Sequence, residues 1–241
     1  MVWPAVESAL ETGNRTAIVA VGSIEQHGPH LPLNMDTLDG DELSRRIALE
    51  LGDAIAAPTI RPGCSGHHMA FPGTITVPPE TLMDVIRAYC RSLDEHGFKY
   101  IALVPTHGGN FGPVKTVAPE IARKIDAAMI PLADLDEHMQ LLNEGLGRAG
   151  IEYEQDVIHA GAAETAMVLA IDDDLVKMDA LESGPEGEIS PARLLSEGFK
   201  SITENGVLGD PTEATAEAGE AIIETVVETY VEHIKTERRE V

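Results

Sequence analysis

Short apolar runs alternate with longer amphipathic segments along this chain. Four runs have the length and composition of buried strands: 17–22, 54–60, 100–106 and 127–133. Between them, apolar residues recur at three- and four-residue steps, as at Leu43, Ile47 and Leu51, which indicates helices. Strands that alternate with helices predict an α/β fold with a mostly parallel central sheet, covered by helices on both faces in three α/β/α layers.

Glycine, proline and capping residues give the expected ends of the helices. We expect helices from near Asp39 to Gly52, over 79–97, from about Pro113 to Ile125, in a short part of 134–158, up to Ile171 and from Pro211 to about Lys235. Residues 172–210 have no clear pattern and are expected to be irregular. The chain has no internal repeat and no clear linker, so we expect a single domain over 1–241.

Loops that contain histidine follow three of the predicted strands. They cover 25–36, 63–73 and 107–110. In parallel α/β sheets, ligands bind in loops beyond the carboxyl ends of the strands. Because all three loops lie at that end, we expect them to converge on one site.

The first of these loops carries Glu25, His27 and Asp36. In an extended backbone, side chains at i and i+2 project to one face, so Glu25 and His27 can reach the same metal cluster. Carboxylate oxygen together with imidazole nitrogen suits Zn²⁺, Mn²⁺ or Fe²⁺. The alternative is a surface loop in a chain that is already rich in acidic residues. The Gly/Pro-rich setting and the other histidine-bearing loops favour metal ligands.

The segment His107-Gly108-Gly109-Asn110 comes directly after the 100–106 run. Its glycines allow the backbone to approach a ligand closely. Their N–H groups, near the start of the next helix, could bind an anion or an oxyanion. The alternative is that His107 has only a structural role, as a histidine at a strand end whose ring nitrogens are hydrogen-bonded within the protein.

Two further pairs of residues are candidates. His67 and His68 are adjacent and point apart in most backbones, so only one should face the site; we favour His68, as a substrate-binding or supporting group, and expect His67 to be structural or solvent-facing. His159 and Glu164 flank a turn into a helix, where Glu164 also has a structural explanation, since the helix dipole favours a carboxylate in the first turn. A role in the site requires this turn to lie against the three loops.

The charge of the chain limits its partners. Among 241 residues, 17 are basic and 41 are acidic, for a formal net charge of −24, and only six of the basic residues are lysines. This composition is typical of a halophilic protein, since large net charge maintains solubility and salt screens its self-repulsion. The lack of a basic face argues against nucleic acid as a partner. No apolar run approaches the ~18 residues of a membrane span, and no signal sequence precedes the first strand, so we expect a cytoplasmic protein without a membrane partner.

Four motifs occur in order: GSIEQHGPHLPLNMDT (22–37), HxxFPGT (68–74), THGGN (106–110) and HAGxxET (159–165). Together they resemble the creatininase-like metal-dependent amidohydrolases. The resemblance implies a single α/β/α domain, a centre of two divalent metal ions, with Zn²⁺ foremost and Mn²⁺ or Fe²⁺ as alternatives, and a small-molecule substrate. It also implies a homo-oligomer, often a hexamer.

The resemblance also implies which residues hold the metal ions. By motif position, Glu25 and His27 would each bind one ion. Asp36 would bridge the two ions, and His107 would complete the first. Such a centre would hold a bridging water of lowered pKa and polarise the substrate carbonyl.

This chain departs from the creatinine-cleaving members at one ligand. Those members have a glutamate two residues after the histidine of the third motif, whereas this chain has Gly109. We expect Glu164 to supply the missing carboxylate, as a ligand and a catalytic group. His159 matches the catalytic histidine of the family and would donate a proton to the leaving nitrogen.

A second departure concerns the substrate. Creatinine-cleaving members enclose creatinine with tryptophans near the last motif, whereas this chain has only Trp3, and Tyr153 is the nearest aromatic residue. We therefore expect hydrolysis of a C–N bond other than a peptide bond, in a cyclic amide or formamide, with Tyr153 near the substrate. One alternative is an archaeal deformylase of a formylamino-ribosylaminopyrimidine phosphate in flavin and deazaflavin synthesis. Others are a mycofactocin-type peptide hydrolase and a non-catalytic metal- and ligand-binding scaffold.

Overall fold

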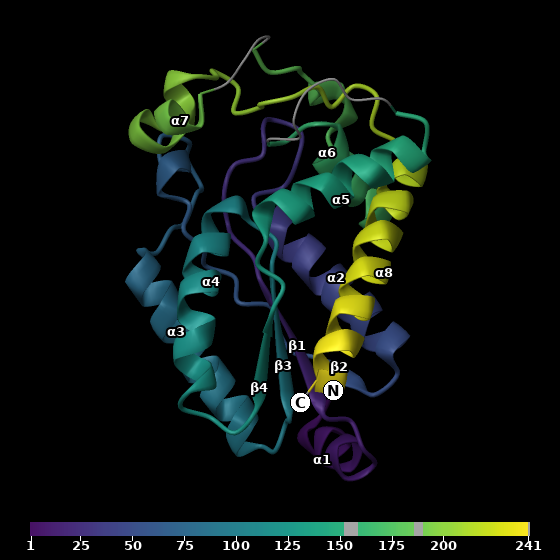
Figure 1. Cartoon of the computed structure of the whole chain (residues 1–241). Coiled ribbons are helices and arrows are strands. Elements are labelled where there is room, and N and C mark those ends of the chain that lie inside the picture. Colours follow the sequence, from purple (N-terminus) through teal and green to yellow (C-terminus); the bar gives the residue numbers. More distant parts are fainter. Residues whose placement is uncertain (152–158, 186–189, 241) are drawn as a thin grey trace.

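Four parallel strands form the central sheet of the computed structural model, which describes residues 1–151, 159–185 and 190–240 (Figure 1). They are β1 (Thr16–Val21), β2 (Ala54–Ala56), β3 (Tyr100–Pro105) and β4 (Ala128–Pro131), in the order β2-β1-β3-β4. β1 pairs with β3 along its whole length. The four predicted strands are confirmed. β2 and β4 are shorter than expected, because Pro58 and Pro131 lack an N–H group for the ladder.

Helices cover both faces of this sheet (Figure 1). One face is covered by α2 (Met35–Leu51), α5 (Leu135–Arg148), α6 (Ala162–Ile171) and α8 (Ala216–Glu240), and the other by α3 (Pro79–Glu95) and α4 (Gly108–Ala122). The side chains of β1 alternate between the two cores, with Ile18 in the first and Val19 in the second. The structure is thus the expected three-layer α/β/α fold.

The remaining elements lie toward the two ends of the molecule. α1 (Trp3–Glu11) lies near both termini at one end, and α7 (Pro191–Glu197) lies at the opposite end (Figure 1). Short 3₁₀ helices occur at η1 (Gly66–His68), η2 (Asp173–Leu175), η3 (Met178–Ala180) and η4 (Phe199–Ser201). The sequence pattern did not predict α1, which buries none of its residues. It also missed α7, which begins where Ser190 Oγ accepts a hydrogen bond from Arg193 N–H.

Two helices begin earlier than expected. α2 begins at Met35 rather than near Asp39, because the chain turns directly after Pro32, whose carbonyl accepts a hydrogen bond from Met35 N–H. Asp36 therefore lies in the first turn of a helix and not in a loop. α4 begins at Gly108, and Pro113 lies inside it. Burial of the apolar face of α4 against the sheet outweighs the hydrogen bond that the proline loses.

The last helix begins later than expected, at Ala216 and not at Pro211. Asp210 does not cap it. Its Oδ1 accepts hydrogen bonds from the N–H and the hydroxyl of Thr212, which makes a local turn. Thr215 Oγ1 caps α8 instead, by accepting a hydrogen bond from Ala218 N–H at 3.1 Å.

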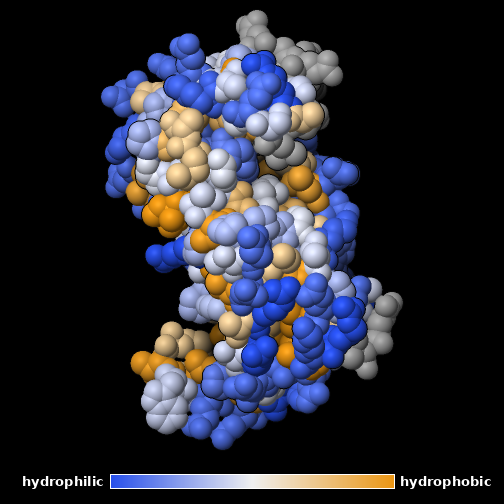
Figure 2. All heavy atoms as spheres, turned by 90° about the vertical axis from the view of Figure 1, so that its left-hand side faces the viewer, coloured by the Kyte–Doolittle hydropathy of each residue, from blue (hydrophilic) through white to orange (hydrophobic). Residues whose placement is uncertain are grey.

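One face of the molecule shows how hydrophilic and hydrophobic residues are distributed on the surface (Figure 2). The face in Figure 2 is mostly hydrophilic, and its hydrophobic groups are small and separated. None of the helices in the described parts of the chain is both long and apolar enough to cross a membrane.

Candidate metal centre

The loop between β1 and α2 buries three polar groups. Glu25, His27 and Asp36 are only 1%, 0% and 2% exposed. The loop is closed by a hydrogen bond of 2.8 Å from Glu25 N–H to Leu33 O. It turns at Gly28, whose φ of +65° favours glycine. Two carboxylates and an imidazole without solvent require charged partners or a cation.

His107 meets this loop from the end of β3. Its Nδ1 lies 3.2 Å from Glu25 Oε2 and 3.7 Å from Asp36 Oδ2. Its Nε2 donates a hydrogen bond of 3.2 Å to Cys64 O, so in the neutral ring the lone pair of Nδ1 faces the carboxylates. Metal-binding histidines are commonly held in this way, with one ring nitrogen on a carbonyl and the other free for the metal.

His27 forms a second group with Asp36 and Glu164. His27 Nε2 lies 3.5 Å from Asp36 Oδ1 and 3.9 Å from Glu164 Oε2. The Nδ1 of this ring donates to Glu25 O at 3.2 Å, which leaves Nε2 free. Within the described residues, His27 Nε2 and Asp36 Oδ2 are buried and have no hydrogen-bond partner. A buried nitrogen and a buried carboxylate oxygen, both without a hydrogen-bond partner and both at one carboxylate–imidazole cluster, fit a bound cation.

The turn before α6 brings His159 and Glu164 to the same place. Ala160 in this turn has a φ of +52°, a strained conformation that costs a residue other than glycine about 1–3 kcal/mol. Its N–H donates to Glu164 Oε2 at 2.5 Å. His159 Nε2 donates to Gln26 O at 2.7 Å. The Nδ1 of His159 therefore faces Glu25 Oε1 and Glu164 Oε2, each 4.0 Å away.

The carboxylates and imidazoles shift the pKa values of one another. Burial lowers the pKa of His27 and of His107, but the nearby carboxylates outweigh it and raise these values to about 10 and about 9. Burial would raise the pKa of Glu25, yet His107 and the other imidazoles hold it well below its usual range. Burial dominates for Glu164 and raises its pKa to about 7. In the metal-free protein, protonated rings therefore supply the positive charge that these carboxylates need.

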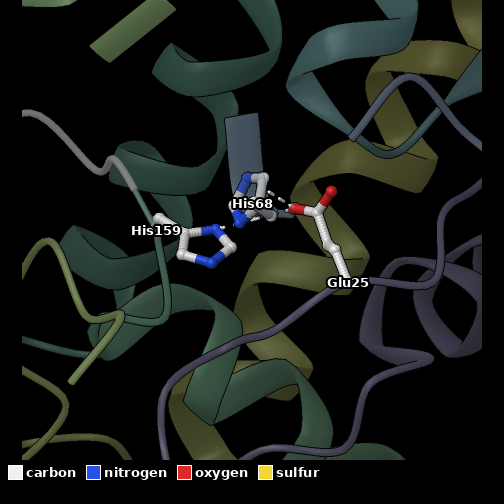
Figure 3. Close-up of side chains that lie close together, drawn as sticks. All are labelled: Glu25, His68 and His159. Carbon is white, nitrogen blue, oxygen red and sulfur yellow. Dashed lines mark ion pairs between the residues drawn. The ribbon is translucent and has the colours of Figure 1, made fainter. Parts of the chain in front are cut away.

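A third group consists of Glu25, His68 and His159, whose side chains point toward one another (Figure 3). His68 comes from η1, is buried, and places its Nε2 3.2 Å from Glu25 Oε1. Burial lowers the pKa of His68 to about 2 and that of His159 well below its usual value, so both rings are neutral. His67 is partly exposed and stacks on His107, with ring centroids 5.8 Å apart.

The chain as a whole matches one known family. The family described as "Creatininase: Creatinine amidohydrolase" matches residues 1–234. This chain belongs to that family. It is accordingly an amidohydrolase, an enzyme that hydrolyses C–N bonds.

Individual relatives are similar over most of the chain. A mycofactocin precursor peptide peptidase of Mycolicibacterium smegmatis is 34% identical over 230 residues, which are 90% of this chain and 83% of the relative. The creatinine amidohydrolase of Pseudomonas putida is 27% identical over 255 residues, 98% of this chain and 95% of the relative. A solved structure described as "Creatininase Mn" has a TM-score of 0.82 at 25% identity and covers 98% of this chain and 96% of that one.

The two glycines of the third family motif differ in the space around them. A Cβ at Gly109 would collide with Cys64 O and with the ring of His107. A side chain at this position would therefore have to displace backbone, so a carboxylate from position 109 does not fit this arrangement. At Gly108, by contrast, a Cβ would meet no neighbouring atom.

Asn110 joins two of the loops that form the centre. Its buried amide nitrogen donates to Val21 O at 3.1 Å and to Gly22 O at 2.9 Å, and its Oδ1 accepts from Cys64 N–H at 3.0 Å. These bonds tie the end of β1 to the loop after β2. Tyr153, expected near the substrate, lies outside the described residues.

Three residues that contact the site were missed by the sequence analysis. Gln26 binds His68 with its side chain, and Gly206 O accepts a hydrogen bond from Gln26. Phe199 of η4 stacks on the ring of His68 at 3.9 Å and meets the ring of His159 at 4.7 Å. Alternation gave no signal for Gln26, because in an extended segment a residue between two inward-facing neighbours is expected to point away from them. Phe199 lies in a segment without a motif.

Proposed function

We propose that the protein hydrolyses a C–N bond of a small amide with two divalent metal ions held on either side of Asp36. The observation that carries the proposal is the position of this carboxylate. Its Oδ2 faces His107, which is next to Glu25, and its Oδ1 faces His27, which is next to Glu164. A carboxylate shared in this way can bridge two ions. The oxygen and nitrogen donors favour Zn²⁺, with Mn²⁺ or Fe²⁺ as alternatives, and the relative described as "Creatininase Mn" supports divalent ions.

The chain's own groups suit proton transfer beside such ions. Bound ions would supply a water of lowered pKa and a polarised carbonyl. His159 is held through its Nε2–H on Gln26 O, so its neutral Nδ1 faces the space between Glu25 and Glu164. In this orientation Nδ1 can take a proton and give it to the leaving nitrogen. Phe199 contacts the ring of His159 edge-on, with ring centroids 4.7 Å apart.

Glu164 takes the place of the carboxylate that is absent at Gly109 in this proposal. Its Oε2 lies 3.9 Å from His27 Nε2, on the side of Asp36 that His107 does not occupy. The N–H of Ala160 holds the same oxygen in place. Burial raises the pKa of Glu164 to about 7 and Asp36 adds to the rise, so a cation beside this carboxyl group would favour its ionised form.

The proposed substrate class is a small molecule with a cyclic amide or formamide bond. The similarity to the creatinine amidohydrolase of Pseudomonas putida supports it. A second candidate is a peptide amide, because the mycofactocin precursor peptide peptidase of Mycolicibacterium smegmatis has the higher identity of the two, at 34%. The homo-oligomer, the cytoplasmic location and the archaeal deformylase activity stay predictions.

A substrate panel with controlled metal content tests the proposal. The protein is stripped with a chelator, reloaded with Zn²⁺ or Mn²⁺, and assayed with creatinine, a formylaminopyrimidine nucleotide, small amides and a mycofactocin-type peptide. We expect two ions per chain, no turnover without metal and restored turnover after reloading. Full hydrolysis by the metal-free protein would contradict the mechanism. One bound ion without turnover of any substrate would indicate a non-catalytic scaffold.

A further inference from the structure

The side-chain amide of Gln26 is fixed by backbone groups on both of its ends. Its Oε1 accepts a hydrogen bond from Gly28 N–H at 2.9 Å, and its Nε2 donates to Gly206 O at 3.1 Å. Turning the amide over would place an oxygen against a carbonyl and an NH₂ group against an N–H group, and both bonds would be lost. The positions of the nitrogen and the oxygen are thus determined by the backbone.

The same amide nitrogen determines which ring nitrogen of His68 carries the proton. Gln26 Nε2 lies 3.0 Å from His68 Nδ1 and 3.0 Å from His159 Nε2. His159 Nε2 carries the proton that it donates to Gln26 O, so this nitrogen cannot accept from the amide. Because an amide nitrogen only donates, His68 Nδ1 accepts, and the ring proton is on Nε2. That Nε2 lies 3.2 Å from Glu25 Oε1 and donates to it (Figure 3). With a proton on Nε2, His68 is a hydrogen-bond donor to Glu25 and not a metal ligand through that atom.

Glu25 is thereby held through one oxygen, and its other oxygen faces the centre. Oε2 lies 3.2 Å from His107 Nδ1. The ring of His68 cannot turn freely, because Phe199 stacks on it at 3.9 Å. Both Phe199 and Gly206 belong to the segment 199–206, which is far from Glu25 in sequence. This segment therefore contacts Gln26 and His68, and His68 in turn contacts Glu25, a candidate metal ligand.

We propose that Gln26 is a positioning residue, which acts through His68 to hold Glu25 in the orientation that leaves Oε2 for a metal ion. Its partner in this role is the segment 199–206, which places Gly206 O and Phe199. The inference rests on the proposed metal centre and adds a residue that neither binds a metal ion nor touches the substrate. Gly206 has a φ of +89°, which favours glycine, and a Cβ there would meet the Gln26 amide.

The ring nitrogens of His68 in the unmodified protein give the first test. Long-range ¹H–¹⁵N spectra of the Zn²⁺-loaded, ¹⁵N-labelled protein distinguish a protonated ring nitrogen from an unprotonated one, and His68→Asn assigns the signals by their loss. We expect the proton on Nε2 and a free lone pair on Nδ1. A proton on Nδ1, or a metal ion on Nε2, would overturn the inference. This test needs no variant at position 26 and no substrate.

Substitution of Gln26 gives the second test. Gln26→Met keeps the length of the side chain and removes both donors, so His68 should populate both tautomers, and the affinity for Zn²⁺ in competition with a chelator should fall about 10-fold to 100-fold. Gln140→Met is the matched control, since the Gln140 amide donates to Glu144 on the exposed face of α5. Unchanged tautomer and unchanged Zn²⁺ affinity in Gln26→Met would contradict the role. A wild-type protein that binds no metal ion would instead contradict the proposed function. The His68 tautomer measured in that same sample would still test the hydrogen bond between Gln26 and His68.

Discussion

His27 and His107 in the candidate metal centre and His138 between the helices are all buried, but their surroundings shift their pKa values in opposite directions. In the candidate metal centre, neighbouring carboxylates raise the pKa of His27 to about 10 and that of His107 to about 9. His138 of α5 is buried as well, but burial alone acts on it and lowers its pKa to about 4. Its Nδ1 lies 3.0 Å from the hydroxyl of Tyr230. His138 has a neutral hydrogen-bond partner, whereas the carboxylates of the candidate metal centre require positive charge near them.

Burial of a histidine is therefore a weak sign of a functional site in this fold, and shared carboxylates are a strong one. Asp36 has an unpaired buried oxygen, and His27 has an unpaired buried nitrogen. By contrast, His138 and Tyr230 form a hydrogen bond within the helical layer and leave no charge uncompensated. The comparison predicts loss of activity from changes in the first region and loss of stability alone from changes in the second.

Asp36→Asn should have the largest effect. Asparagine has a single side-chain oxygen and cannot offer one carboxylate oxygen to each donor group, so both ions would lose a ligand. We expect no measurable turnover and reduced metal content, with an unchanged circular dichroism spectrum. Asp173→Asn, an exposed position in η2, is the control and should keep wild-type kcat/KM. Wild-type turnover of Asp36→Asn with two bound ions would show that Asp36 is not a bridge.

His159→Gln should lower kcat while the metal ions stay bound. Glutamine can still donate a hydrogen bond to Gln26 O, but it cannot accept and release a proton. General acid–base catalysis contributes roughly 10²-fold to 10⁴-fold, so kcat should fall within that range and KM should change little. Steady-state kinetics and metal analysis on the same preparation distinguish a loss of proton transfer from a loss of bound metal ions. A kcat equal to that of wild type would assign the proton transfer to another group.

The first region could largely be predicted from the sequence, because its signals are local. An apolar run predicts β1, and the spacing of Glu25 and His27 predicts a shared face. The contact between Gln26 and Gly206 could not be predicted, since 180 positions separate them and no motif marks the second residue. The early start of α4 was missed because Pro113 is a local stop signal that tertiary packing outweighs. The sequence therefore could not predict contacts that form only when distant segments pack together.

Metal binding should release protons from the first region. In the metal-free protein near neutral pH, His27 and His107 hold their protons, since their pKa values are about 10 and about 9. Both rings must be neutral to bind a metal ion, and Glu164, whose pKa is about 7, must be ionised, so loading both ions near neutral pH should release roughly two to three protons per chain. The metal affinity should accordingly rise with pH up to about these values. Calorimetric titrations in two buffers of different ionisation enthalpy count the protons, and no release would mean that the rings are neutral before the metal binds.

His138→Leu should have the smallest effect, confined to stability. The Tyr230 hydroxyl would lose its buried partner, which costs about 1–3 kcal/mol, and kcat/KM should stay at the wild-type value. The sign of the pH dependence follows from the folded pKa of about 4 and an unfolded value of about 6.5. Between these values the unfolded chain binds a proton that the folded protein does not. This contribution to the free energy of unfolding is therefore fully present above pH of about 6.5 and is lost as the pH falls toward 4.

Urea unfolding of wild type and His138→Leu at pH of about 7.5 and about 5 separates this effect from all other titrations, because groups common to both proteins cancel in the difference. Wild type should lose more stability than the variant between the two values. The double variant His138→Leu/Tyr230→Phe removes both partners and should recover part of the stability at pH of about 7.5, since no buried polar atom is left unpaired. An equal pH dependence in wild type and variant would mean that His138 carries a proton in the folded protein. In that case burial would not lower the pKa of His138, and the contrast between the two buried regions would be wrong for the second region.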